Sequence, residues 1–288
     1  MGNDECYIFR EWTPPSPPPI YVKIVRTVYV ITTAPPGDMS ERLKEALRHL
    51  GNVNIAPSIV IVYNRTYKRC HKELCHKTSS YDLIDANRHT AQHAQAHFPG
   101  ESICIMEDDF QWTDVSTAAT HLEHVRDFVK KKAQVMDHYS LGSLSFPFGV
   151  WPISWNLRHW CIQKGGWFQS VIHTPRGIDK LASIPFCIDD KSDERDIGID
   201  TVCIEENVTY MYFMPLTVQP INDSHNQKEN WGKKLWGQIG TRFARQWKMH
   251  EDPRRGTYAV YILVVVLPLC LMIVIGAILI ACIVSRKV

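Results

Sequence analysis

The N-terminal residues lack the apolar core that a secretory signal peptide requires. Residues 1–13 instead carry four charged side chains, Asp4, Glu5, Arg10 and Glu11. We therefore expect that the N-terminus is not translocated across a membrane. The chain also lacks internal repeats, and its formal net charge is only +2 over 288 residues. This charge balance gives no indication of nucleic-acid binding.

The cysteines lack the spacing of a disulfide framework. There are nine of them, and Cys270 and Cys282 lie in an apolar run near the C-terminus, which leaves seven in the rest of the chain. An odd number without framework spacing favours a reducing compartment, because disulfides form and persist in oxidising ones.

Two groups of histidine and cysteine lack the partners that a zinc site needs. They are Cys70, His71, Cys75 and His76, and the histidines His89, His93 and His97 at intervals of four residues. An i, i+4 histidine pair can bind zinc. However, no second Cys/His pair follows the first group at zinc-finger distance, and no acidic or thiol ligand lies near the second. We expect neither group to hold a metal ion.

Charge is absent from the longest apolar run, Ala259 to Val284, which only Pro268 and Gly276 interrupt. As a helix rising about 1.5 Å per residue, the 26 residues of this run reach about 39 Å, enough to cross a hydrocarbon core of about 30 Å. The run predicts one C-terminal transmembrane helix, residues 258–284, followed by the short tail 285–288. The alternative is a buried core helix.

Basic residues are concentrated on the N-terminal side of this run. Residues 228–257 contain eight Lys or Arg and three Asp or Glu, whereas the far side has only Arg286 and Lys287. The positive-inside rule therefore places the large domain in the cytosol. Aromatic and aliphatic side chains from Trp236 to Trp247 recur at helical spacing. They predict a juxtamembrane helix that lies on an anionic leaflet or packs on the domain.

The composition outside the apolar run is that of a globular domain, since 45% of the chain is hydrophobic and 22% is charged. A proline-rich segment occupies residues 1–20. Setting this segment and the C-terminal regions aside leaves residues 21–227, which is enough for one α/β core.

Strand and helix patterns alternate through this domain. A β-branched run predicts a first strand at residues 22–32, and Ser40 caps a helix that Gly51 ends. Residues 58–63 predict the second strand, and residues 81–98 predict a second helix. Strands joined by right-handed helical crossovers form a mostly parallel sheet flanked by helices. We therefore expect an α/β fold.

The next strand ends in three consecutive carboxylates. Residues 102–106 form a short apolar run, and Glu107, Asp108 and Asp109 follow it directly. Carboxylates at the C-terminal end of a parallel strand lie in the crevice where open α/β sheets bind ligands. A divalent cation would relieve the repulsion among them, and Mg²⁺ or Mn²⁺ also binds diphosphates. The alternative is a solvated acidic turn.

This segment resembles the "DXD" region of GT-A fold glycosyltransferases, and most closely that of family 25, the procollagen galactosyltransferase and lipooligosaccharide-biosynthesis type. Ile105-Met106-Glu107-Asp108-Asp109 is similar to that family's Ile-Leu-Glu-Asp-Asp. Residues 198–201 and 210–220 are similar to its Asp-containing helix and the aromatic strand that ends Pro-x-x-x-x-Gln. Residues 165–170, with a helix over 176–183, resemble the intervening element. The likeness covers roughly residues 22–226.

The resemblance implies a membrane-anchored, metal-dependent glycosyltransferase with a GT-A-like sheet. It would move a sugar from a nucleotide-sugar donor to a glycan, protein or lipid acceptor, using Mn²⁺ or Mg²⁺. A metal that bridges the donor phosphates stabilises the leaving group. Two alternatives stay open: a catalytically inactive GT-A-like module tethered to the membrane, and a metal-dependent phosphohydrolase.

The same resemblance implies roles for individual residues. Asp109 would be the direct metal ligand, and Glu107 and Asp108 would face the metal, ribose or sugar. If the reaction inverts configuration, Asp200 is the candidate base for the acceptor hydroxyl, although a capping or salt-bridge role is equally open and Asp190, Asp193 and Asp196 are nearby. The remaining candidates are His225 for the metal, and Asp85, Asn87 and Arg88 for the base or ribose.

Overall fold

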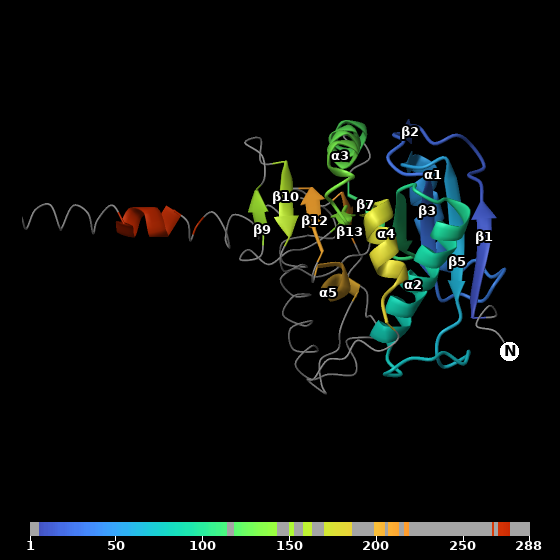
Figure 1. Cartoon of the computed structure of the whole chain (residues 1–288). Coiled ribbons are helices and arrows are strands. Elements are labelled where there is room, and N and C mark those ends of the chain that lie inside the picture. The colour runs from blue at the N-terminus through green and yellow to red at the C-terminus, as the bar shows by residue number, and fades with distance from the viewer. Residues whose placement is uncertain are drawn as a thin grey trace, which may run out of the picture. The chain divides into compact units, whose positions relative to one another are not determined.

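The computed structural model describes residues 6–113, 118–142, 150–152, 158–162, 170–185, 199–204, 207–212, 216–218, 267 and 270–276. The chain forms two compact units, residues 1–226 and residues 227–288. All the labelled helices and strands belong to the first unit (Figure 1).

A mixed sheet forms the centre of the first unit. Among the described strands its order is β1 (Tyr7–Trp12), β5 (Ser58–Asn64), β3 (Thr27–Thr32), β6 (Ile103–Glu107), β11 (Ser170–His173), β8 (His138–Ser140), β12 (Thr209–Tyr212), β10 (His159–Ile162) and β9 (Val150–Pro152). β3 pairs in parallel with both β5 and β6, and β12 pairs in parallel with β8. The other neighbours are antiparallel. The expected α/β fold is confirmed, but the sheet is mixed where a mostly parallel one was expected, because the strands beside β6 and β5 pair antiparallel. The predicted strands β3, β5 and β6 form one parallel part of it.

Two small sheets flank this one. β2 (Ile20–Tyr21) pairs in parallel with β4 (Val53–Asn54), and β7 (Gln111–Trp112) pairs antiparallel with β13 (Thr217–Val218). β7 follows the carboxylate triplet within a few residues, so this second pair fixes the chain just beyond it.

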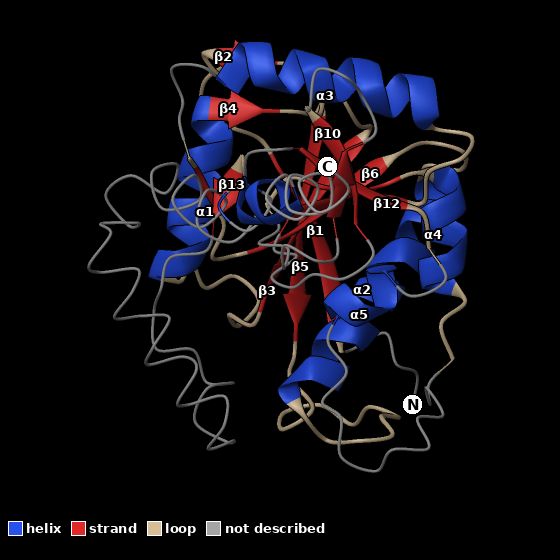
Figure 2. Cartoon of the chain, turned by 90° about the vertical axis from the view of Figure 1, so that its left-hand side faces the viewer, coloured by secondary structure: helices blue, strands red, loops and turns tan. Residues whose placement is uncertain are grey.

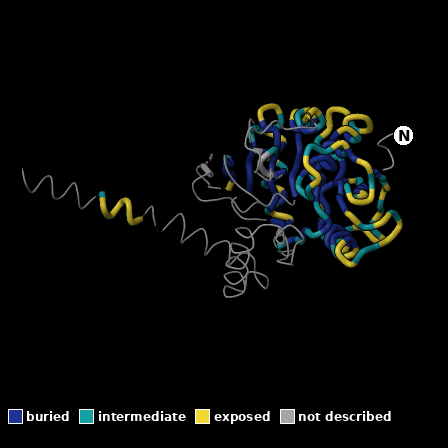
Figure 3. The backbone as a smooth tube through the Cα atoms, turned by 90° about the horizontal axis from the view of Figure 1, so that it is seen from below, coloured by how far each residue is buried: buried dark blue, intermediate teal, exposed yellow. Residues whose placement is uncertain are grey.

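Helices cover both faces of the main sheet (Figure 2). α1 (Glu41–Asn52) and α3 (Ala118–Lys132) share one hydrophobic core with the sheet. α2 (Ser79–His97), α4 (Pro175–Ala182) and α5 (Ile199–Ile204) share the other. The central strands between them are buried, and the exposed residues of this unit lie mainly on the outer helix faces and in loops, with some on the edge strand β1 (Figure 3).

The sequence of the central strands explains why both faces are covered. All six residues of β3 are buried, with Val28 and Val30 in the α1/α3 core and Tyr29 and Ile31 in the α2/α4/α5 core. Successive side chains of a strand point to opposite faces. A strand that is apolar at every position therefore requires a helical layer on each side.

Capping residues fix where the helices begin. The Ser40 hydroxyl accepts a hydrogen bond from the Leu43 N–H at 3.2 Å, which confirms the predicted cap of α1. Thr78 and Thr174 accept from the main chain in the same way at the starts of α2 and α4. Each cap satisfies one main-chain donor that the first helical turn leaves without a partner.

From the sequence, residues 1–20 are expected to be separate from the α/β domain. In the structure, part of this segment forms β1 of the main sheet. β1 pairs along its whole length with Ile59 to Asn64 of β5, and Tyr7 at its start is buried. The first strand was expected over residues 22–32, but β3 begins only at Thr27. Before β3, the N–H groups of Val22 and Ile24 donate to the carbonyls of Asn54 and Ile55.

In the second unit, the structure describes residues 267 and 270–276, which are helical. The large apolar side chains from Leu271 to Ile275 are exposed. Within the described part of the chain, no helix has both the length and the apolar character to cross a membrane. Most of the predicted span 258–284, and all of the segment 228–257, lie outside the described residues.

Candidate active site

The carboxyl ends of β3, β5 and β6 lie at one edge of the sheet because these strands are parallel. Ile31 of β3 pairs with Glu107 of β6. The Asp108 N–H then donates to the Ile31 carbonyl at 3.0 Å, which extends the pairing one residue beyond the strand. The acidic triplet is therefore positioned by main-chain hydrogen bonds at the edge where α/β sheets bind ligands.

Asp108 points to the α1 side of this edge and is only 8% exposed. The Thr32 hydroxyl donates to its Oδ2 at 2.6 Å, and the Arg42 guanidinium lies 2.8 Å from its Oδ1. Burial raises the pKa of Asp108, while Thr32 and Arg42 lower it and Asp109 raises it further. A charged Asp108 is thus costly to bury and depends on nearby positive charge.

Arg42 supplies positive charge to both neighbouring aspartates. It lies in the first turn of α1, and its guanidinium is also 2.9 Å from Asp109 Oδ2. The Arg42 side chain is 55% exposed. Two carboxylates so close together repel each other unless a cation lies between them. The arrangement provides oxygen ligands suited to Mg²⁺ or Mn²⁺ beside a cationic side chain that solvent can reach.

Glu107 points to the opposite face of the sheet. It shares a pocket with Asn87 of α2, His173 of β11 and Cys203 of α5, lined also by Ile105, Met106, Val171 and Ile199. The structure therefore brings Asp108 and Asp109 together and places Glu107 elsewhere. The expectation that Glu107 and Asp109 lie together as metal ligands does not match this arrangement. β6 ends at Glu107, and the turn that follows it brings Asp109 to Arg42 on the α1 side.

Asp85 and Arg88 are buried and bound to each other at 2.6 Å. The Tyr7 hydroxyl donates to the second oxygen of Asp85. Asp85 thus connects α2 to β1, and Arg88 pairs with it within α2. This arrangement accounts for their burial without a nucleotide. Their neighbour Asn87 is the member of this group that lines the Glu107 pocket.

The other two candidates are only partly located. Asp200 lies in α5, whose Ile199 and Cys203 line the Glu107 pocket, but its side chain is outside the described atoms. His225, Asp190, Asp193 and Asp196 lie outside the described residues. Their assigned roles stay predictions.

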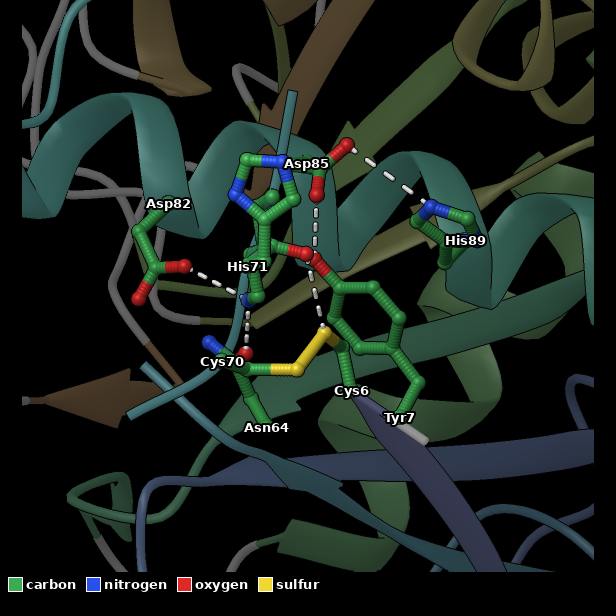
Figure 4. Close-up of a disulfide and its surroundings, with 9 residues drawn as sticks. Cys6, Tyr7, Asn64, Cys70, His71, Asp82, Asp85 and His89 are labelled. Carbon is green, nitrogen blue, oxygen red and sulfur yellow. Dashed lines mark hydrogen bonds and ion pairs between the residues drawn. A yellow bond between two sulfur atoms is a disulfide. The ribbon is translucent and has the colours of Figure 1, made fainter. Parts of the chain in front are cut away.

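A disulfide joins Cys6 to Cys70 beside β1 (Figure 4). Cys75 is also disulfide-bonded. These cysteines are therefore not zinc ligands, as expected for the group from Cys70 to His76. The disulfide does contradict the inference of a reducing compartment, because such bonds are rare in reducing compartments.

A buried lysine and the α2 histidines complete the contact with β1. The Lys72 ammonium lies 2.6 Å from Asp82 Oδ1 and over the ring of Tyr7. Asp82 and Tyr7 are labelled in Figure 4. His89 stacks on Tyr7 at 4.3 Å, and His93 stacks on Phe9 at 4.0 Å. His89 and His93 therefore serve as a packing surface for β1, and His97 stacks on His93.

Sequence reasoning missed one group of possible metal ligands. His138, His173 and Cys203 lie on β8, β11 and α5, and their ligand atoms are within 4.8 Å of one another. No local motif joins them, because they are up to 65 positions apart in the sequence. The signal in the sequence that could have indicated this group was a histidine in each of two short buried strands, β8 and β11.

Arg42→Gln is expected to tighten Mn²⁺ binding about fivefold, because a half-exposed ion pair that a cation must displace is worth about 1 kcal/mol. Thermal shift with increasing MnCl₂ measures this. Arg48→Gln is the matched control: Arg48 is equally exposed on α1 and is paired with Glu45. It should leave the Mn²⁺ response unchanged. Weaker Mn²⁺ binding by Arg42→Gln would show that the guanidinium supports the cation site rather than competing with it.

Comparison with known proteins assigns no family. No family model matches the chain, and no curated protein matches it. Among solved structures, the crystal structure of A197 from STIV is similar over 65% of this chain and 81% of that chain, with 13% sequence identity and a TM-score of 0.35. A similarity at this level carries no argument about fold or function.

Proposed function

We propose that the chain is a metal-dependent glycosyltransferase that moves a sugar from a nucleotide-sugar donor to a glycan, protein or lipid acceptor. One observation carries the proposal. Asp108 and Asp109 meet at the carboxyl edge of the parallel strands and share one cationic partner, Arg42. The sequence resemblance to GT-A enzymes of family 25 adds the reaction class.

The donor atoms at this edge fit Mn²⁺ or Mg²⁺, since they are carboxylate oxygens. Such an ion, when bound, would neutralise the charge that develops on the leaving diphosphate. Thr32 holds Asp108 in one orientation through its hydroxyl. Arg42 is exposed enough to move from the carboxylates to a phosphate, a group that a guanidinium binds well.

Asp200 is the proposed base for the acceptor hydroxyl. Its helix α5 borders the pocket that contains Glu107. A base must lie within hydrogen-bond reach of the proton it removes. We therefore propose that donor and acceptor meet at the carboxyl edge of the sheet, where the reacting atoms can approach each other. The donor diphosphate lies beside Asp108 and Asp109, and the acceptor enters from the α5 side.

Attachment to a membrane through residues 258–284 is part of this proposal. The absence of charge from 259 to 284 supports it, as do the exposed apolar side chains from Leu271 to Ile275. The basic segment 228–257 favours a cytosolic domain. Resistance of the full chain to alkaline extraction, lost on deletion of residues 258–288, is the expected result. Release of the full chain would contradict the attachment.

The test of function is a panel of nucleotide sugars incubated with the full chain and MnCl₂, MgCl₂ or EDTA. We expect one donor to release its nucleoside diphosphate with the metal and not with EDTA. p-Nitrophenyl phosphate in parallel tests the phosphohydrolase alternative. Phosphate release from it without any donor turnover would replace the proposal with that alternative. Donor binding by thermal shift without turnover of any donor or ester would indicate the inactive binding module.

A further inference from the structure

A buried group of nitrogen and sulfur atoms lies on the face of the sheet opposite Asp108. His138 and His173 are directly opposite each other on the antiparallel strands β8 and β11. Their Nδ1 atoms are 2.9 Å apart. Cys203 of α5 completes the group, and the three residues are 2%, 0% and 0% exposed.

The surrounding structure holds this group in place. α4 packs so closely on β8 that a Cβ at Gly177 would lie 2.1 Å from the Asp137 carbonyl oxygen and 2.9 Å from His138 Nδ1. The Asp137 carboxylate anchors the same helix through Arg176 at 2.9 Å and Lys180 at 3.0 Å. His138 therefore has little freedom to turn away from His173.

The chemical state of the group suits a metal. Both rings are almost fully buried, which disfavours the charged imidazolium form that cannot bind a metal. Among the described residues, His173 Nε2 is buried without a hydrogen-bond partner. A buried polar atom left in this way is costly.

We propose that His138, His173 and Cys203 bind a zinc ion. Imidazole nitrogen and thiolate sulfur are the preferred zinc ligands, at about 2.0–2.1 Å and 2.3 Å. Tetrahedral angles at those lengths put the ligand atoms roughly 3.3–3.6 Å apart. The three ligand atoms lie within 4.8 Å of one another, so side-chain shifts of roughly an ångström complete the site.

Two of the three ligands reach a pocket. His173 and Cys203 line it together with Asn87. A water would complete the coordination, as in zinc sites with three protein ligands. The inference is independent of the proposed sugar transfer, because Asp108 and Asp109 offer only oxygen ligands and lie with α1.

Metal analysis of the full chain, purified in detergent with a tag that contains no histidine, is the first experiment. We expect about one zinc per chain, removed by a strong chelator and restored by added zinc. Cobalt in place of zinc should give a sulfur-to-cobalt charge-transfer absorption. The inference would be overturned if the purified protein contained no zinc and took up neither zinc nor cobalt. The contact between His138 and His173 would then be a hydrogen bond between two buried histidines.

Two variants locate the ion. Cys203→Ser and His173→Gln should each lower zinc affinity by about 10–100-fold or more, since even indirect partners of a metal contribute that much. Cys203→Ser should also abolish the cobalt–sulfur absorption. Cys104→Ser is the control, because Cys104 is an equally buried free cysteine on β6, and it should retain both signals. Either variant suffices if the other fails to fold. Full zinc affinity in a folded variant would contradict the assignment.

Discussion

Asp109→Asn is expected to reduce metal-dependent sugar transfer by about 100-fold or more, because even the outer partners of a metal typically contribute 10–100-fold. Asp109 contacts Arg42, which is half exposed, and lies beside Asp108, whose charge it disfavours. The substitution removes one anionic ligand and one like-charge neighbour together. The measurement is turnover of the best donor at limiting and saturating Mn²⁺.

The fold should survive this substitution. The half-exposed ion pair that it removes is worth at most about 1 kcal/mol, and Asp108 is relieved of a neighbouring charge. The melting temperature without metal should therefore stay equal or rise. Asp127→Asn is the control, since it removes an exposed carboxylate from α3 that is paired with Arg126, and it should leave both quantities unchanged. Wild-type turnover of Asp109→Asn at limiting Mn²⁺ would show that Asp109 is not a ligand.

The parallel part of the fold could be predicted because each of its elements carries a local signal. β3 and β5 are β-branched runs, and α1 has a cap at Ser40. These signals depend on interactions within a few residues, which a single sequence contains. The antiparallel strands from β8 to β12 are only three or four residues long, too short for a periodic pattern to identify.

The position of the three carboxylates at the end of β6 could be predicted. Their adjacency in the sequence did not show which of them lie on the same face of the sheet. Glu107 is the last residue of β6 and faces α2 and α5, whereas Asp108 faces α1. Strand alternation alone implies this division. Three acidic residues in a row should therefore be assigned to faces of the sheet before they are assigned to one ion.

The disulfide and the histidine–cysteine group depend on contacts between segments that are far apart in the sequence. Cys6 and Cys70 are separated by 64 positions, and a count of cysteines does not determine their pairing. His138, His173 and Cys203 are brought together by strand order and by the packing of α5. Only the tertiary structure shows such groups, because none of their members has a partner at a diagnostic spacing.

Loss of the Cys6–Cys70 disulfide is expected to destabilise the first unit by about 4 kcal/mol, the chain-entropy estimate for closing a loop of this length. For a unit of this size the melting temperature should fall by roughly 8–16 °C. Cys6→Ser/Cys70→Ser should show this change in a thermal melt. The wild type under reductant should show at least this change, because reduction also opens the disulfide of Cys75. Cys270→Ser under oxidising conditions is the control, because Cys270 is a free cysteine whose side chain is exposed, and it should melt close to the wild type.

If residues 258–284 attach the chain to a membrane, as proposed, the same bond decides which side of that membrane the domain faces. We expect a peptide map of protein extracted with free thiols blocked at lysis to contain Cys6 joined to Cys70. Because disulfides seldom persist in the cytosol of mesophiles, this result in a mesophilic host would place residues 1–226 in an oxidising compartment. It would overrule the orientation inferred from the basic segment 228–257. Two blocked thiols and a melting temperature insensitive to reductant would instead contradict the disulfide and keep the domain in the cytosol.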